Sequence, residues 1–421
     1  MRRFPRAFAL AATLAVPAAP AFVPGDAGAA ILKVDDDGMP CSTAGYTTIQ
    51  AAVAAAAPGD TIVVCAGHYT GQVVLDKSLK IRGKAPKVKD CDTLVAPDPA
   101  LYSVFESPAV TGLGGIGIDV LADEVTILGM AFTNAGETAV RTDPAHNGFT
   151  LKGSVFYGNA NGIYFHSSAR TKGMPVSSVR NSCFRRNVQA GIRTRYGLDD
   201  AVISRNLFSE TAEAAAIIVD QEPGSTTDRL KVLRNESRSD STFAVIVGTT
   251  DSSFERNTVD GALGTAIFVG GNNENLSLFR NVVSNAGTRG IRFNTFFFGG
   301  GASTGVTVSK NTVTGAGVHG IVVDSVSGES ALEFSTIAEN TVSGSGAGGS
   351  GDGIRVEGGA TANPGNRVQF NTISGSANHD CHDATTGGGT AGTDSFWAGN
   401  GAATQNVANL CFTGPANGVA D

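Results

Sequence analysis

Side chains that could transfer protons beside an anionic substrate recur in four short segments of the chain. Each segment begins with an apolar residue, and its second and fourth positions are mostly charged or aromatic. The segments are Val140-Arg141-Thr142-Asp143, Ile163-Tyr164-Phe165-His166, Ile192-Arg193-Thr194-Arg195 and Ile217-Ile218-Val219-Asp220. Alternate side chains of a strand point to opposite faces, so an inward first residue places the second and fourth residues outward.

Two outward columns follow if the four segments stack as neighbouring parallel strands. Equivalent positions would then lie about 4.8 Å apart. One column is Asp143, His166, Arg195 and Asp220, and the column beside it is Arg141, Tyr164, Arg193 and Ile218. An acid, an imidazole and several guanidinium groups would share one rigid face.

Proton transfer at a carbon next to a carboxylate is the chemistry that such a face would support. His166 is the candidate general base or acid, with its pKa tuned by Asp143. Arg193 and Arg195 could hold a uronate carboxylate and stabilise an enolate-like charge. Tyr164 could stack on a sugar ring or pass a proton. The predicted catalytic residues are Asp143, Tyr164, His166 and Arg195, and the predicted substrate-binding residues are Arg141, Arg193 and Asp220.

An ordinary solvated sheet face explains the same residues without catalysis, and this interpretation stays open. Outward positions are normally polar, and neighbouring Asp, His and Arg side chains form surface ion pairs. If the face is catalytic, Asp143 and Asp220 stand three strands apart, about 14 Å, which is too far for the two carboxylates of a glycoside hydrolase. A lyase or epimerase mechanism therefore fits better than hydrolysis.

The element that must position these residues is a repeat anchored on an asparagine. The anchors are Asn181, Asn206, Asn235, Asn257, Asn281, Asn311, Asn340 and Asn371, at intervals of 22 to 31 residues. Repeats of this period predict a solenoid. Each repeat holds short β-type runs separated by Gly, Asn and Ser, and it cannot bury its apolar face alone, so the coils must stack. We expect the asparagines to form an inward ladder, each amide bonding its neighbours one coil away.

The two ends of the chain differ from the repeat. Residues 1–29 have a basic start, a short apolar run and a small-residue exit, which predicts a cleaved signal peptide and no membrane span. Residues 30–378 are predicted to form the solenoid, with an Ala-rich capping helix near Thr48–Ala57 followed by a strand. Residues 379–421 lose the repeat and are predicted to form a C-terminal cap. The chain is therefore expected to be secreted, either extracellular or periplasmic.

Six cysteines in an exported chain indicate disulfides. We predict the bridges Cys41–Cys65 and Cys381–Cys411, which leaves Cys91 and Cys183 with a pairing that is only a guess. No cofactor or metal is predicted, and calcium has no motif to support it. The tail segment His379-Asp380-Cys381-His382-Asp383 could bind a metal, although a solvated capping loop is the favoured interpretation.

A family resemblance rests on the segment Tyr46–Val53, the turn Pro58-Gly59-Asp60-Thr61-Ile62 and the Gly67-His68-Tyr69 that follows. These resemble the N-terminal cap of the pectate-lyase-like superfamily, and the asparagine-anchored repeats resemble its coils. The resemblance covers nearly all of the mature chain and implies an all-β, single right-handed parallel β-helix. That superfamily contains polysaccharide lyases, hydrolases, esterases, epimerases and adhesins, so the fold does not by itself assign a function.

Two short matches to catalytic segments of this superfamily are interpreted as coincidence. Asp199-Asp200 and His319-Gly320 are similar to parts of the polygalacturonase site, but the remaining segments are missing. Asp380-Cys381-His382-Asp383 is similar in outline to the Asp-Pro-His-Asp segment of alginate epimerases, but Cys replaces Pro and the segment lies in the predicted cap.

The overall charge limits the choice of partner. A formal net charge of −7 disfavours nucleic acid, whereas an acidic polysaccharide needs only local positive charge. The leading hypothesis is a monomeric, secreted protein that acts on or binds a polysaccharide or cell-surface glycan. The rival is a non-catalytic surface, matrix or adhesion scaffold. The run Phe296–Phe298 would shield a core edge or, in the minority interpretation, bind a partner.

Overall fold

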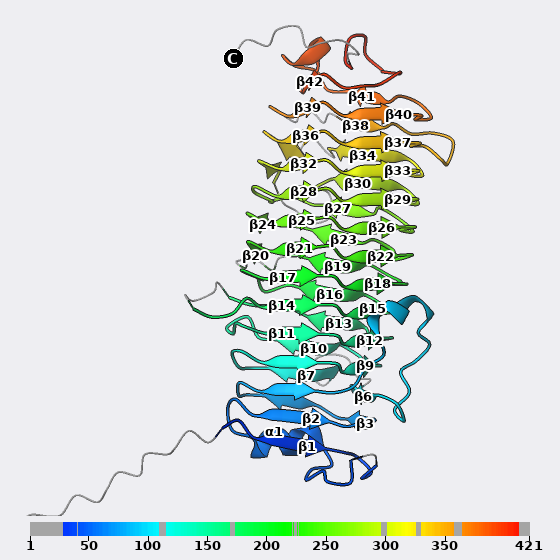
Figure 1. The fold of residues 1–421 in the computed structure, drawn as a ribbon. Helices are drawn as coiled ribbons and strands as arrows, with labels where there is room; N and C mark the ends of the chain where they lie inside the picture. Colours follow the sequence, from blue (N-terminus) through cyan, green and yellow to red (C-terminus); the bar gives the residue numbers. More distant parts are fainter. Residues whose placement is uncertain are drawn as a thin grey trace, which may run out of the picture.

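The chain winds into one stack of coils, in which each full coil contributes one strand to each of three parallel sheets (Figure 1). The computed structural model describes residues 28–39, 41–108, 115–168, 173–220, 222, 225, 227–295, 301–325, 330–357 and 364–411. Almost all of the predicted signal peptide, and the run Phe296–Phe298, lie outside the described residues. No helix of the described part is long and apolar enough to cross a membrane.

The first sheet, sheet A, has 14 strands. They are β1 Ile31–Val34, β2 Thr61–Val64, β5 Lys80–Arg82, β8 Thr126–Leu128, β11 Thr150–Lys152, β14 Ser178–Arg180, β17 Val202–Ser204, β21 Lys231–Leu233, β25 Ser253–Glu255, β28 Ser277–Phe279, β32 Thr307–Ser309, β36 Thr336–Ala338, β39 Arg367–Gln369 and β42 Phe396–Ala398.

The second sheet, sheet B, has 12 strands. In most coils, two residues separate the end of a sheet A strand from the start of the sheet B strand that follows it. They are β3 Gly67–Thr70, β6 Ser103–Glu106, β9 Ala131–Thr133, β12 Val155–Tyr157, β15 Cys183–Arg185, β18 Leu207–Ser209, β22 Glu236–Arg238, β26 Thr258–Asp260, β29 Val282–Ser284, β33 Thr312–Thr314, β37 Thr341–Ser343 and β40 Thr372–Ser374.

The third sheet, sheet C, also has 12 strands and contains the residues predicted to be functional. They are β4 Val73–Leu75, β7 Ile116–Val120, β10 Thr138–Thr142, β13 Asn161–Tyr164, β16 Ala190–Thr194, β19 Ala215–Val219, β23 Ala244–Ile246, β27 Ile267–Val269, β30 Arg289–Phe293, β34 His319–Asp324, β38 Ile354–Glu357 and β41 Cys381–Asp383. Two further short pairs lie between sheets C and A, namely β20 Thr227–Asp228 with β24 Thr249–Thr250, and β31 Ser303–Thr304 with β35 Leu332–Glu333.

The predicted asparagine ladder lies at the turn between sheets A and B. The side-chain amide of Asn257 donates to Oδ1 of Asn281 at 2.9 Å and to the carbonyl of Val232 at 3.0 Å, while its own Oδ1 accepts from Asn235. The same pattern links Asn206, Asn235, Asn257, Asn281, Asn311, Asn340, Asn371 and Asn400. The ladder is thus confirmed, and it continues one coil beyond the predicted repeat.

One anchor was assigned wrongly. Asn181 does not join the ladder; the position belongs to Ser182, whose backbone N–H bonds Oδ1 of Asn206 at 3.0 Å. The residue before each ladder position has a positive φ, and Asn181 occupies that position with φ 48°. In this coil the Arg-Asn pair therefore lies one residue earlier relative to the ladder than in the other coils. Asparagine suits the left-handed backbone position as well as the ladder position, so the sequence pattern did not distinguish the two.

Inward side chains from all three sheets fill the solenoid. Phenylalanine rings of sheet B stack from coil to coil, with centroids 4.8 Å apart for Phe132–Phe156, 4.7 Å for Phe156–Phe184 and 5.0 Å for Phe184–Phe208. Glycine is the second residue of several strands of sheet C for a steric reason. A Cβ on Gly191 would lie 2.9 Å from both the carbonyl of Ala216 and the ring of Phe208.

The N-terminal mouth of the stack is covered by helix α1, Ile49–Ala55, as predicted. Thr48 caps it by accepting a hydrogen bond from the Ala51 N–H, and Ile49, Ala52 and Val53 are buried. The predicted disulfide Cys41–Cys65 ties the cap to β2, with 6.3 Å between the Cα atoms. A second bridge, Cys91–Cys183, joins the 3₁₀ helix η1, Val88–Thr93, to β15.

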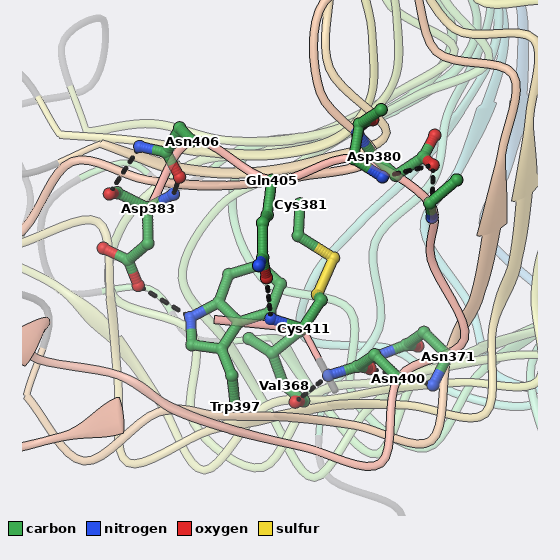
Figure 2. Close-up of a disulfide and its surroundings, with 12 residues drawn as sticks. Val368, Asn371, Asp380, Cys381, Asp383, Trp397, Asn400, Gln405, Asn406 and Cys411 are labelled. Carbon is green, nitrogen blue, oxygen red and sulfur yellow. Dashed lines mark hydrogen bonds between the residues drawn. A yellow bond between two sulfur atoms is a disulfide. The ribbon is translucent and has the colours of Figure 1, made fainter. Parts of the chain in front are cut away.

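The C-terminal mouth is closed around the third disulfide, Cys381–Cys411, which was also predicted (Figure 2). The indole of Trp397 is buried beside it and donates from Nε1 to Oδ2 of Asp383 at 2.7 Å. β41 and β42 extend sheets C and A past residue 378, and the short 3₁₀ helix η3, Thr390–Gly392, lies between them. All six cysteines are paired.

Candidate functional site

The outer face of sheet C brings together the residues that the sequence placed in one column. The strand register pairs Arg141 with Tyr164, Tyr164 with Arg193 and Arg193 with Ile218. This column continues as Val245, Phe268, Arg292, Val322, Arg355 and His382. The outer face is therefore one continuous vertical surface over the length of the sheet.

In the N-terminal half of this face, the predicted binding groups are already paired within the chain. Arg141 makes a bidentate ion pair with Asp119, through contacts of 2.9 and 2.6 Å. Arg193 donates to Asp220 at 2.7 Å, and Arg195 donates to Glu222. These pairs leave little free positive charge for a substrate carboxylate.

Tyr164 and Asp143 are also engaged. The Tyr164 hydroxyl donates to Oε1 of Glu137 at 2.7 Å, and burial together with this bond holds the pKa of Tyr164 well above its ordinary value. The carboxylate of Asp143 accepts the Ala145 N–H at 2.8 Å in the turn that follows β10. Their assigned roles stay predictions that the geometry does not favour.

The prediction that His166 is displayed to solvent is wrong, since the residue is only 1% exposed. Its Nδ1 lies 2.8 Å from the carbonyl of Thr142, and its Nε2 accepts the backbone N–H of Arg195 at 3.3 Å. The ring of Tyr196 lies 5.3 Å away. Burial lowers the pKa of His166 to about 4, so the ring is neutral and bonds the two neighbouring coils, with no nitrogen free for a substrate.

The C-terminal half of the same face holds a denser set of ionisable groups. Three of the six histidines of the chain, His319, His379 and His382, face the carboxylate of Asp352. The distances from Nδ1 to the nearer carboxylate oxygen are 3.7, 3.3 and 3.5 Å, in that order. We call this group the Asp352 centre.

Asp352 is buried and fully bonded. Its Oδ1 accepts the backbone N–H of His379 at 3.1 Å and lies 3.3 Å from Nδ1 of the same residue. Its Oδ2 accepts from Nη1 of Arg355 at 2.6 Å. Burial alone would raise the pKa of Asp352, but the bonds from His382 and Arg355 outweigh it and hold the pKa well below its ordinary value. The group is thus a permanent carboxylate.

His319 is a neutral imidazole with a defined tautomer. The backbone N–H of Asp352 donates to its Nδ1 at 3.0 Å, so the ring proton is on Nε2. Burial, reinforced by the positive charge of Arg355, lowers the pKa of His319 to about 4. The residue that the sequence analysis interpreted as coincidence is therefore part of the centre.

Arg289 lies directly beside His319 in the strand register. Its side chain makes no hydrogen bond or ion pair with any described residue, and its Nε is buried without an acceptor. Burial, together with repulsion from Arg292, lowers the pKa of Arg289. A half-buried cation without an anion is energetically costly, and a bound carboxylate would remove that cost.

Asp352, His379 and His382 could also act as ligands of a metal ion, since their ligand atoms lie within 4.8 Å of one another. However, Arg355 places a fixed positive charge 2.6 Å from one of the carboxylate oxygens. This cation competes with a metal for the same oxygen, so the donor set fits acid–base chemistry better.

Comparisons with known proteins agree with the fold. Residues 138–297 match the family model described as the right handed beta helix region. The chain is a right-handed parallel β-helix. The predicted fold class, an all-β single right-handed parallel β-helix with a short N-terminal helix, is confirmed. A search of curated protein sequences found no significant match.

Several solved structures share the fold at low sequence identity. The catalytic domain of a GH87 α-1,3-glucanase in complex with tetrasaccharides superposes with a TM-score of 0.58 and 13% identity, and the match covers 81% of this chain and 64% of that domain. The chain thus spans just under two thirds of that domain. The A-module of a mannuronan C-5 epimerase from Azotobacter vinelandii has a TM-score of 0.49 and 17% identity, with 88% and 92% covered.

Proposed function

We propose that this protein is a secreted, carbohydrate-active β-helix that transfers protons on an acidic polysaccharide at the Asp352 centre. The observation that carries the proposal is Arg289, a half-buried cation without a partner among the described residues, which lies beside His319 at the edge of the Asp352 centre. An acidic sugar supplies the missing anion. The three disulfides support the export that the signal peptide predicts.

Each residue of the centre has a defined part in this mechanism. Arg289 pairs with a carboxylate of the polyuronate and holds the polymer on the His319 side of the centre. Asp352 accepts a hydrogen bond from Nδ1 of His379, so Nε2 of His379 keeps its lone pair and accepts the proton from the carbon next to a uronate carboxylate. His319 presents its Nε2 proton to the substrate and is neutral at pH 7.

Two outcomes of this proton transfer are possible for a uronate. If His379 returns the proton that it has taken to the leaving glycosidic oxygen, the chain is cut by β-elimination and an unsaturated sugar forms. If water gives a proton to the carbanion carbon from the opposite face and the resulting hydroxide takes the proton from His379, the product is the epimer. A sugar substrate is supported by the GH87 α-1,3-glucanase domain of the same fold, whose structure is in complex with tetrasaccharides.

The test is incubation of the protein with polygalacturonate, alginate and a neutral glucan. Unsaturated products are followed by ultraviolet absorbance and epimers by proton NMR. We expect turnover of a polyuronate, a loss of about 10²- to 10⁴-fold in kcat for His379→Gln, and a rise of about 10- to 100-fold in KM for Arg289→Gln.

The matched control is His146→Gln, which changes a half-exposed histidine near the N-terminal half of the sheet. It should leave turnover unchanged, and thermal melting should show all three variants folded. Absence of turnover on every polyuronate, or hydrolysis of the neutral glucan alone, would contradict the proposal. The first result would favour the non-catalytic scaffold, which the closed ion pairs of the N-terminal half of sheet C also favour.

A further inference from the structure

A column of positive charge follows the asparagine ladder on the outside of the stack, at the turn between sheets A and B. The residue before each ladder position is Arg205, Arg234, Arg256, Arg280 or Lys310 in five consecutive coils. The backbone N–H of Arg205 bonds the carbonyl of Leu233, and that of Arg234 bonds the carbonyl of Glu255, so the positions stack one coil apart. The rise per coil is about 4.8 Å.

All five residues adopt a backbone conformation that does not suit them. Their φ angles lie between 53° and 57°, in the left-handed region. Glycine and asparagine tolerate this region best, and the same position is Gly153, Asn181 and Gly399 in other coils. The turn itself therefore does not require a cation, and the same position is Glu339 and Phe370 in the two coils that follow Lys310.

The first three members of this column, Arg205, Arg234 and Arg256, border an open groove over the outer face of sheet A. The groove has a volume of about 770 Å³. It is lined by the cations Lys152, Arg180, Arg205, Arg234 and Arg256, by the hydroxyl residues Thr150, Ser178 and Ser204, and by Asn181, Pro175, Val176, Val202, Leu233 and Glu255. Five cationic side chains thus face a single carboxylate.

The cations of the groove are available to a ligand. Lys152, Arg180, Arg205, Arg234 and Arg256 are all exposed, and none forms a side-chain ion pair with a described residue. This contrasts with sheet C, where Arg141, Arg193 and Arg195 are paired. The groove is strongly positive although the whole chain carries a formal net charge of −7. Local charge of this kind attracts a polyanion.

We propose that this groove is a binding site for an acidic polysaccharide, distinct from the Asp352 centre, in which the polysaccharide lies along the stack. Guanidinium groups repeated once per coil match a polymer that carries a carboxylate on successive sugars. Serine and threonine hydroxyls on the floor of the groove suit the sugar hydroxyls. None of the described lining residues is aromatic, which disfavours single-stranded nucleic acid, since that ligand binds by stacking its bases.

The decisive variant is Arg205→Asn/Arg234→Asn/Arg256→Asn. Asparagine is the residue at the equivalent position of the coil below, Asn181, so the triple variant should melt at or above the temperature of the parent. Binding of polygalacturonate is measured by calorimetry at about 0.1 M salt, where the Debye length is about 10 Å. We expect a loss of affinity of about 100-fold, on the basis of typical gains per cation near an anionic surface.

The matched control is Lys33→Ser/Lys87→Ser/Arg367→Ser, which removes three exposed cations outside the groove. It should change the affinity by less than about 3-fold, because charges beyond a Debye length are screened. The dependence of log affinity on log salt concentration should become shallower only in the groove variant. A neutral dextran should not bind any of the proteins.

Three results would overturn the inference. They are unchanged affinity in the groove variant, an equal loss in the control variant, and equally tight, groove-dependent binding of a single-stranded oligonucleotide. The inference stands apart from the proposed catalytic function. His379→Gln should bind polygalacturonate like the parent, whereas the groove variant should keep any turnover of short soluble uronate oligomers.

Discussion

His166 bonds the backbones of the two coils that flank it, and its neutral ring is what makes this possible. Protonation would place a second N–H against the Arg195 N–H and break the bond between them. Since burial lowers the pKa of the folded state to about 4, against about 6.5 in the unfolded chain, the unfolded state binds the proton first as the pH falls. The contribution of His166 to the free energy of unfolding is therefore complete above pH 6.5 and is lost as the pH falls towards 4.

A His166→Gln variant tests this linkage at the scale of one residue. Glutamine keeps a donor and an acceptor but cannot titrate. The parent should lose on the order of 3 kcal/mol from this residue between pH 6.5 and 4, and the variant should not. The measurement is the free energy of unfolding at both values of pH, compared between parent and variant.

The difference between parent and variant reports on His166 alone, because other titrating groups are present in both proteins. One of these groups, Asp240, changes the stability in the opposite direction. Burial raises the pKa of Asp240 to about 6, so Asp240 favours the folded state more as the pH falls over the same interval. The control His146→Gln removes a histidine with a half-exposed side chain. If that control flattens the pH dependence as much as His166→Gln does, the assignment to His166 fails.

At the scale of the elements, the asparagine ladder determines how one coil lies on the next. Each amide both donates to a carbonyl of the coil below and accepts the backbone N–H of a neighbouring ladder residue. The backbone groups that bond this amide are buried. Removal of one amide therefore leaves both a buried donor and a buried acceptor without a hydrogen bond. A hydroxyl is a partial substitute, because Oγ of Ser182 accepts the Ser154 N–H at 3.2 Å.

We therefore expect Asn257→Ala to destabilise the protein by about 3 kcal/mol and Asn257→Ser by clearly less. Urea unfolding followed by circular dichroism gives the two values. Asn378→Ala is the control, because this exposed asparagine donates only from its backbone. Equal effects of Ala and Ser at position 257 would mean that packing, and not hydrogen bonding, determines the cost.

At the scale of the whole molecule, the ends and the middle of the stack are held by different means. Coils in the middle have neighbours on both sides, but a terminal coil would expose its apolar interior without a cap. Helix α1 and the Cys41–Cys65 bridge close one end, and Trp397 with the Cys381–Cys411 bridge closes the other (Figure 2). The single tryptophan of the chain therefore reports only on the C-terminal cap.

The variant Cys381→Ser/Cys411→Ser should separate the unfolding of the cap from that of the stack. The bridge closes a 30-residue segment, for which chain entropy predicts a stabilisation of about 3 to 4 kcal/mol. We expect the midpoint of the tryptophan fluorescence transition to fall further than the midpoint seen by circular dichroism. Transitions that coincide in parent and variant alike would instead indicate one cooperative unit.

Much of this architecture could be predicted from the sequence because it depends on local and periodic features. A repeat of about 27 residues, with strand alternation inside it, predicted the stacked coils and the column Arg141–Tyr164–Arg193–Ile218. The even number of cysteines and their places near the two ends predicted two of the three bridges. These inferences need only the directions of neighbouring side chains and the requirement that apolar faces be buried.

The tertiary structure alone decided which side chains are free to act. His319 and Asp352 are 33 residues apart, and Asp352 and His379 are 27, so coils of unequal length bring the three side chains together from neighbouring levels of the stack. Alternation predicted an outward His166, yet the residue lies two residues past β13 and is buried, with its nitrogens bonded to backbone groups of two coils. Alternation gives the direction of a side chain, but its exposure and its charge partners depend on loops and on coils far away in the sequence.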